Sequence, residues 1–89
     1  MYILLINNCY DDFLVQRFKI VESLDDAKYW FKDEVEFATL NTVEESNKET
    51  AIKKLSQLGY KITDTEYQFK AFLNENNYFS IDICKIEEL

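Results

Sequence analysis

The sequence has no histidine, no proline and a single glycine, Gly59, among its 89 residues. Without histidine, the chain lacks the side chain that most often exchanges protons near neutral pH and most often binds metals. With one glycine, it cannot form the glycine-rich loops that hold phosphate groups. The remaining carboxylates, tyrosines, lysines and thiols are not arranged as a catalytic set. We therefore predict a protein that is not an enzyme, has no catalytic residue and binds no metal or cofactor.

Acidic residues outnumber basic ones by 17 to 10, which gives a formal charge of -7 at pH 7. This charge repels nucleic-acid phosphates and anionic membranes, and the longest basic run is only Lys53-Lys54. The partner that the charge favours is a larger basic or nucleic-acid-handling bacterial protein, without direct contact to nucleic acid. Solubility alone is the alternative explanation for the charge.

Neither the N-terminus nor the cysteines indicate export from the cell. The apolar run of residues 2–6 stops at Asn7-Asn8, which is too short for a signal peptide or a membrane span, so we expect a cytoplasmic protein. Cys9 and Cys84 lie far apart without a CxxC spacing and cannot form a zinc site. Each lies at the end of an expected strand, which makes a disulfide conceivable, but buried free thiols are the expectation in a reducing compartment.

A hairpin is expected at the start of the chain. Residues 2–6 form a branched apolar run typical of a buried strand. Residues 7–12 form a turn cluster in which Asn and Asp supply left-handed conformations. Residues 13–21 then alternate between two faces, which indicates a second strand antiparallel to the first.

Two helices are expected in the middle of the chain. Ser23 is followed by acids and by apolar residues spaced three or four apart, which is the pattern of a capped amphipathic helix. The pattern breaks near residue 40. Either residues 42–45 or residues 46–49 could cap the second helix, and Gly59 marks its end because it can adopt the left-handed conformation that follows a helix.

A second hairpin completes the predicted fold. Residues 66–73 and 78–84 alternate on either side of four polar residues, although the first run would also tolerate a helix. The order ββααββ predicts one α+β domain over residues 1–89, with a four-stranded, mostly antiparallel sheet and two helices on one face. The apolar residues Ile86 and Leu89 are expected to hold the C-terminal tail against the body.

Aromatic residues are in excess, with seven Phe, six Tyr and one Trp. A core of this size cannot bury them all, so several are expected at the surface, where aromatic anchors among acidic residues suit a protein interface. The residues that we predict to bind a protein are Tyr10, Asp11, Asp12, Phe13, Glu66, Tyr67, Tyr78 and Asp82. The same rings could instead fill a seam between two copies of the chain.

The opening and the end of the chain resemble a group of small proteins of phages and mobile elements that begin ββα and are mostly uncharacterised. The similar segments are residues 1–8, Tyr10-Asp11-Asp12, residues 18–22, residues 23–31 and residues 78–89. They cover about half of the chain. In size and charge the chain is also similar to anti-CRISPR inhibitors, which implies a protein that blocks a nucleic-acid channel or an assembly surface.

These observations lead to one main hypothesis and two alternatives. The main hypothesis is a non-enzymatic inhibitor from a phage or mobile element that occludes a basic surface of a larger bacterial protein. The first alternative is a structural or regulatory module that forms a homodimer through its uncovered sheet face. The second alternative is an immunity protein that neutralises a toxin.

Overall fold

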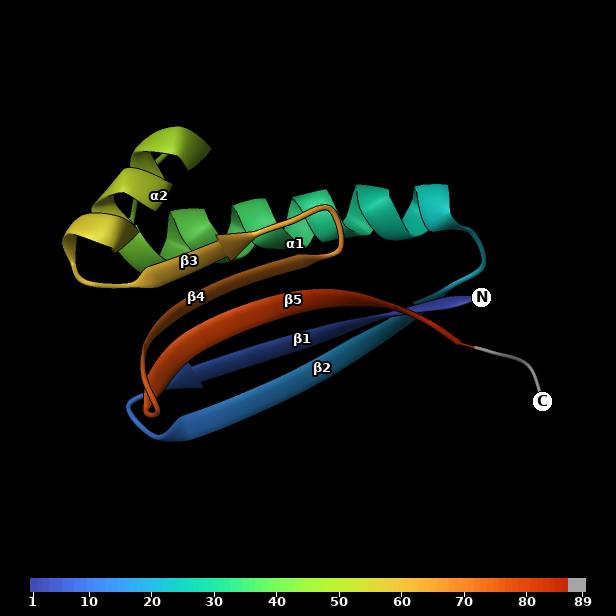
Figure 1. The fold of residues 1–89 in the computed structure, drawn as a ribbon, viewed down its shortest axis with the longest axis horizontal. Helices are drawn as coiled ribbons and strands as arrows, with labels where there is room; N and C mark the ends of the chain where they lie inside the picture. Colours follow the sequence, from blue (N-terminus) through green and yellow to red (C-terminus); the bar gives the residue numbers. More distant parts are fainter. Residues whose placement is uncertain (87–89) are drawn as a thin grey trace.

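Two helices cover one face of a five-stranded antiparallel sheet (Figure 1). The structure, a computed structural model, describes residues 1–86. The strands lie in the order β2-β1-β5-β4-β3, so the first and last strands of the chain are neighbours in the centre of the sheet. The elements are β1 (Tyr2–Tyr10), β2 (Phe13–Val21), α1 (Leu24–Val43), α2 (Lys48–Gln57), β3 (Lys61–Asp64), β4 (Gln68–Asn74) and β5 (Asn77–Lys85).

The first hairpin forms because two aspartates accept left-handed backbone conformations. Asp11 has a φ of 50° and Asp12 a φ of 69°, and the two residues alone connect β1 to β2. Positive φ at both central residues defines the type I′ turn, whose twist matches that of paired strands. The turn that we expected in this region is thus confirmed, but it is shorter than residues 7–12, because Asn7 and Asn8 belong to β1.

Both helices begin at the polar caps that the sequence offers. The Ser23 hydroxyl accepts a hydrogen bond from the Asp26 amide at 3.1 Å, and the Asn47 side chain accepts one from the Thr50 amide at 3.2 Å. Such caps satisfy amides that have no partner inside the helix. Of the two starts left open for the second helix, residues 46–49 therefore contain the cap. Gly59, with a φ of 100°, follows α2 as expected.

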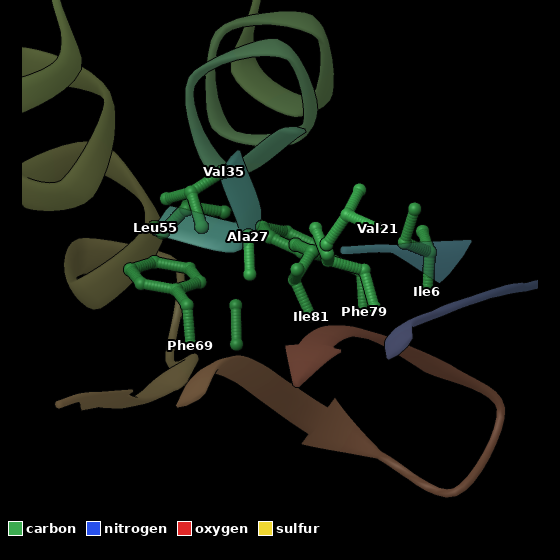
Figure 2. Packing of buried hydrophobic residues seen from close by; sticks show 10 residues of the cluster. Ile6, Val21, Ala27, Val35, Leu55, Phe69, Phe79 and Ile81 are labelled. Carbon is green, nitrogen blue, oxygen red and sulfur yellow. The ribbon is translucent and has the colours of Figure 1, made fainter. Parts of the chain in front are cut away.

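The core lies between the helices and the face of the sheet that they cover (Figure 2). Val35 of α1 and Leu55 of α2 point toward Phe69, Phe79 and Ile81 on the strands, and all five side chains are buried. The rings of Phe69 and Phe79 stack with their centroids 5.9 Å apart. Complete burial of one such side chain contributes about 2 kcal/mol, so this layer supplies the main driving force for folding.

The α+β class is confirmed, but the prediction of four strands is wrong. β3, for which we predicted no strand, pairs with β4 from Lys61↔Phe72 to Asp64↔Phe69 and makes the order ββααβββ. Four residues are too few to show a strand period, and only Ile62 among them is partly buried. The backbone of Ile86 does bind the body of the protein, since its amide donates to the Met1 carbonyl at 3.0 Å. Leu89 lies outside the described residues.

The first helix also extends past the break that we expected near residue 40. It continues to Val43, because Glu44 adopts a left-handed conformation with a φ of 54° and its amide donates back to the Leu40 carbonyl. Thr39, which lies just before this extension, is fully buried. Its hydroxyl donates to the Val35 carbonyl at 2.9 Å, so the polar atom is satisfied inside the core.

Candidate protein-binding surface

The tips of the two hairpins lie side by side at one end of the sheet (Figure 1). The Asp12 amide donates to the Asn76 carbonyl at 3.1 Å, and the Asp11 amide donates to the Asn77 side chain at 3.2 Å. The thiol of Cys9 contacts the Glu75 carbonyl at 3.8 Å. Backbone contacts thus bring the β1–β2 turn against the β4–β5 turn.

We name this end the hairpin-tip surface, which consists of Tyr10, Asp11, Asp12, Phe13 and Glu75. All five residues are exposed, Tyr10 at 75% and Phe13 at 72%. Within residues 1–86, the carboxylates of Asp11 and Asp12 take part in no hydrogen bond or ion pair, since the contacts of these residues use backbone amides. The surface therefore offers large rings next to acids that the fold does not use.

A groove of about 480 Å³ adjoins the hairpin-tip surface at Tyr10. It lies between the C-terminal half of α1 and the helix-side face of β1 and β2. Phe37 on α1 is 63% exposed, and Val15 on β2 is 45% exposed, so the two walls of the groove carry exposed apolar surface. An apolar groove with a few polar groups is the usual form of a binding site.

The polar groups of the groove include one ion pair that joins its two walls. Arg17 of β2 donates to Glu34 of α1 at 3.1 Å. Glu34 is the more buried partner, with 18% of its side chain exposed against 55% for Arg17. The amide of Asn8 and the polar side chains of Asn41 and Thr42 also line the groove. A ligand in this groove would thus meet apolar walls and a paired, rather than a free, positive charge.

Two of the predicted binding residues lie at the opposite end of the molecule. Glu66 and Tyr67 occupy the loop between β3 and β4, where Glu66 pairs with Lys28 of α1 and the Lys28 ammonium lies 5.6 Å from the centre of the Tyr67 ring. The hydrogen bond to Glu66 raises the pKa of Lys28. The structure therefore separates these residues from the hairpin-tip surface, and their contacts connect the loop to α1.

The other two predicted residues lie on the sheet face that no helix covers, which we call the open face. Tyr78 is next to Phe72, with ring centroids 6.0 Å apart, and Asp82 is paired in register with Leu5 and Gln68. Both residues are only partly exposed. The eight predicted residues thus divide among three regions, and only Tyr10, Asp11, Asp12 and Phe13 come together.

Charge is distributed unevenly over the described residues. The strands carry five basic residues and two acidic ones, Asp64 and Asp82, so acidity is concentrated in the helices and turns. The basic residues of the strands are Arg17, Lys19, Lys61, Lys70 and Lys85. Of these, the register places Lys61 and Lys70 on the open face with Asp82. The open face is therefore not the acidic surround that the sequence suggested for Tyr78 and Asp82, because a one-dimensional pattern does not reveal which charges share a face.

Sequence reasoning missed the groove and the exposure of β2. Phe37 is an apolar residue of the first helix, but it lies on the flank of α1 beside β2, where nothing in the described chain covers it. Phe18 and Ile20 were expected on one face of a strand, and both are more than half exposed. The signal that could have identified this strand as an edge is Arg17 and Lys19, because charges are common on edge strands.

Three further observations concern metals, thiols and membranes. Residues 1–86 contain no group of three or more Cys, Asp or Glu side chains placed to hold a metal. Cys9 is buried, Cys84 is partly buried, and both thiols are free. Cys9 is opposite Tyr78 and Cys84 is opposite Ile3, so the two cysteines lie too far apart along the paired strands to form a disulfide. No helix in the described part of the chain is long and apolar enough to cross a membrane.

Comparison of the chain with models of protein families, with curated proteins and with solved structures finds no match.

Proposed function

We propose that this protein is a non-enzymatic binding module that uses its hairpin-tip surface and the adjoining groove to cover a basic surface of a larger bacterial protein. The observation that carries the proposal is the position of Tyr10, which belongs to both the hairpin-tip surface and the groove. An exposed acidic rim and an apolar recess are thus continuous. Binding interfaces combine these two features, because buried apolar anchors supply affinity and rim charges increase the rate of encounter.

The charge of the surface favours a basic partner. Asp11, Asp12 and Glu75 place three acids on one end of a chain of net charge -7. Because these carboxylates are exposed, each is worth little as an isolated pair, but together they steer a positively charged surface into contact. A partner that binds nucleic acid has such a surface, and occupation of it would block nucleic-acid binding. An inhibitor of the phage or mobile-element type, including an anti-CRISPR protein, would act in this way in the cytoplasm.

The groove favours a partner with one protruding apolar side chain. A volume of about 480 Å³ accommodates a large side chain together with its neighbours, and Phe37, Tyr10 and Val15 would surround it. Truncation of one of the few hot-spot residues near the centre of an interface costs about 2 kcal/mol or more, whereas rim residues cost less. The proposal therefore assigns affinity to the groove and the salt-dependent association rate to the acids.

The double variant Asp11→Asn/Asp12→Gly tests the acids without disturbing the turn. Asn-Gly is the preferred sequence for a type I′ turn, so the hairpin keeps its shape while two carboxylates are removed. Affinity capture from a bacterial lysate, at low and moderate salt, would compare this variant with the original chain and with Phe37→Ser.

The proposal predicts that the original chain captures one basic protein. The double variant should capture less of this protein than the original chain does at low salt. Phe37→Ser should capture much less of it at both salt concentrations. Equal capture by all three chains would contradict it. The identity of the captured protein distinguishes a nucleic-acid-handling target from a toxin, which an immunity protein would neutralise with the same surface chemistry.

A further inference from the structure

β2 is a long edge strand with no partner on its outer side in the part of the chain that the structure describes. It pairs with β1 at nine consecutive positions, from Tyr2↔Val21 to Tyr10↔Phe13, without a bulge. The other edge strand, β3, has only four residues. Long, regular edge strands present backbone groups that can pair with another strand, and proteins usually protect them with bulges, prolines, charged side chains or short length. β3 is short. β2 is neither short nor bulged, and its two charges, Arg17 and Lys19, are engaged with Glu34 and Trp30 of its own chain.

The backbone groups at the free edge of β2 can be identified from the pairing. A two-residue type I′ turn is closed by a hydrogen-bonded pair, here Tyr10 and Phe13, and such pairs alternate along the ladder. The Ile86 amide donates to the Met1 carbonyl, which independently places the odd-numbered residues of β1 toward β5. The residues whose amides and carbonyls face outward, here named the edge residues, are Leu14, Gln16, Phe18 and Ile20.

The side chains of the edge residues are exposed and mostly apolar. Phe18 is 67% exposed and Ile20 is 53% exposed, and both lie on the open face beside Leu5 and Ile3. Two thirds of a phenylalanine is on the order of 100–150 Å². The exposed apolar side chains of Leu14, Phe18 and Ile20 together offer on the order of 300 Å², which supplies part of the apolar area of a specific dimer interface of roughly 800 Å² per partner.

The charges near β2 also favour a second copy of this chain over a basic partner. The two charges of β2 are both positive, and both are already engaged: Arg17 with Glu34 at 3.1 Å, and Lys19 over the Trp30 ring at 3.1 Å. A basic surface would gain no electrostatic attraction from this strand, because it carries no acidic residue. Each copy has a net charge of -7, and most of its acids lie in the helices and turns. Two copies therefore repel one another least when they make contact through their strands.

We infer that two copies of this chain pair through their β2 strands, antiparallel about a two-fold axis at Arg17, to form one continuous ten-stranded sheet. In this register Leu14 of each copy is opposite Ile20 of the other, and Gln16 is opposite Phe18, so every edge residue exchanges both of its backbone hydrogen bonds. Registers shifted by two residues leave edge residues unpaired. The two Arg17 side chains meet at the axis, each with its own Glu34 as counter-ion.

The pairing leaves the hairpin-tip surfaces free. Because the strands are antiparallel, the two tips lie at opposite ends of the paired β2 strands, roughly 30 Å apart at about 3.3 Å per residue over nine residues. The inference therefore does not depend on the proposed role of the tip acids, although Val15 and Arg17, which line the groove, lie near the two-fold axis. The variant Asp11→Asn/Asp12→Gly removes only tip charges and is expected to pair like the original chain.

The test combines oligomeric state with amide hydrogen exchange of the full chain over a wide range of concentration. In the dimer, the amides of Leu14, Gln16, Phe18 and Ile20 gain protection as concentration rises, whereas the amides of Val15, Arg17 and Lys19, which bind β1, are protected throughout. A chain that stays monomeric at high concentration would overturn the inference. A dimer whose edge amides remain unprotected would also overturn it, since such a dimer uses another surface.

Substitutions at the edge give an independent measurement. Gln16→Pro removes a backbone amide that points away from β1, so the hairpin tolerates the change. We expect the dimer affinity to fall roughly tenfold or more, because each copy loses the hydrogen bond that this amide donates to the other copy. Gln16→Thr is the matched control and should leave affinity nearly unchanged. Phe18→Lys should weaken the dimer strongly, whereas Leu58→Lys, which changes an equally exposed residue on the helical side, should not. Equal effects of Phe18→Lys and Leu58→Lys would contradict the register.

Discussion

The aspartates at the β1–β2 turn provide a prediction that separates folding from binding. Asp11 and Asp12 both hold positive φ, at 50° and 69°, and their hydrogen bonds to the other turn use backbone amides. Their carboxylates are therefore not required for the fold. The double variant Asp11→Asn/Asp12→Gly keeps both amides and supplies the preferred residues of a type I′ turn.

We expect this variant to be more stable than the original chain by about 0.5–1 kcal/mol. At position 12 the backbone is left-handed, with a φ of 69°. This conformation costs most residues about 1–2 kcal/mol, and Asp somewhat less, whereas it costs Gly nothing. The greater conformational freedom of Gly in the unfolded chain cancels about 0.5–1 kcal/mol of this gain. Removal of two carboxylates beside Glu75 also reduces repulsion. The opposite change, Asp12→Val, should cost about 1–2 kcal/mol, because a β-branched residue is poorly suited to this conformation.

Urea unfolding followed by circular dichroism measures both differences as shifts of the midpoint at constant slope. A loss of stability in the Asn-Gly variant would refute the reasoning. It would mean that the carboxylates contribute to folding, and their exposure would then no longer indicate a role in binding.

Three further predictions concern the core, the end of α2 and the response to alkaline pH. Leu55→Ala should lower the free energy of unfolding by about 2–5 kcal/mol in urea melts, because Leu55 is fully buried, and a loss below 1 kcal/mol would show that the helical layer is loosely packed. Gly59→Ala should cost about 1–2 kcal/mol in the same assay, because its φ of 100° is strained for any side chain, and an unchanged midpoint would contradict that conformation. Burial, with a contribution from Tyr10, raises the pKa of Tyr60 in the folded protein. The neutral phenol therefore contributes to the stability of the fold below about pH 10, and this contribution is lost as the pH rises through the pKa of the folded state. Tyr60→Phe should therefore remove a phenol that ionises above the ordinary pKa of tyrosine in an absorbance titration, and a titration curve unchanged at its alkaline end would contradict the assignment.

The sequence was most informative where local chemistry determines structure. The structure has three features that short motifs predicted. Ser23 with its following acids predicted a helix cap, the Asp11-Asp12 pair predicted a turn, and Gly59 predicted a helix end. In each case a side chain or a backbone preference acts on residues within four positions. β3 could not be predicted in this way, because Lys61–Asp64 is held by its pairing to β4 rather than by a pattern of its own.

The candidate site was less predictable, because it depends on contacts between distant residues. Alternation correctly separated the two faces of β2 but could not show that the strand lies at an edge, where both faces are largely exposed. Likewise, the excess of aromatic residues indicated exposed rings without indicating which would gather. The hairpin-tip surface needs the order β2-β1-β5-β4, which brings Glu75 next to Asp11 although they are far apart in sequence.

Site-specific photo-cross-linking tests the central claim most directly. A photoreactive phenylalanine analogue would replace Tyr10 or Phe37, and in a matched control Tyr29, which is 66% exposed on the outer side of α1. Irradiation in a bacterial lysate, with mass spectrometry of the products, would identify what each position contacts. The proposal predicts that Tyr10 and Phe37 cross-link to the same basic protein and that Tyr29 does not. Cross-links to that protein from Tyr29 but not from Tyr10 or Phe37 would contradict the claim that the hairpin-tip surface and its groove form the binding site.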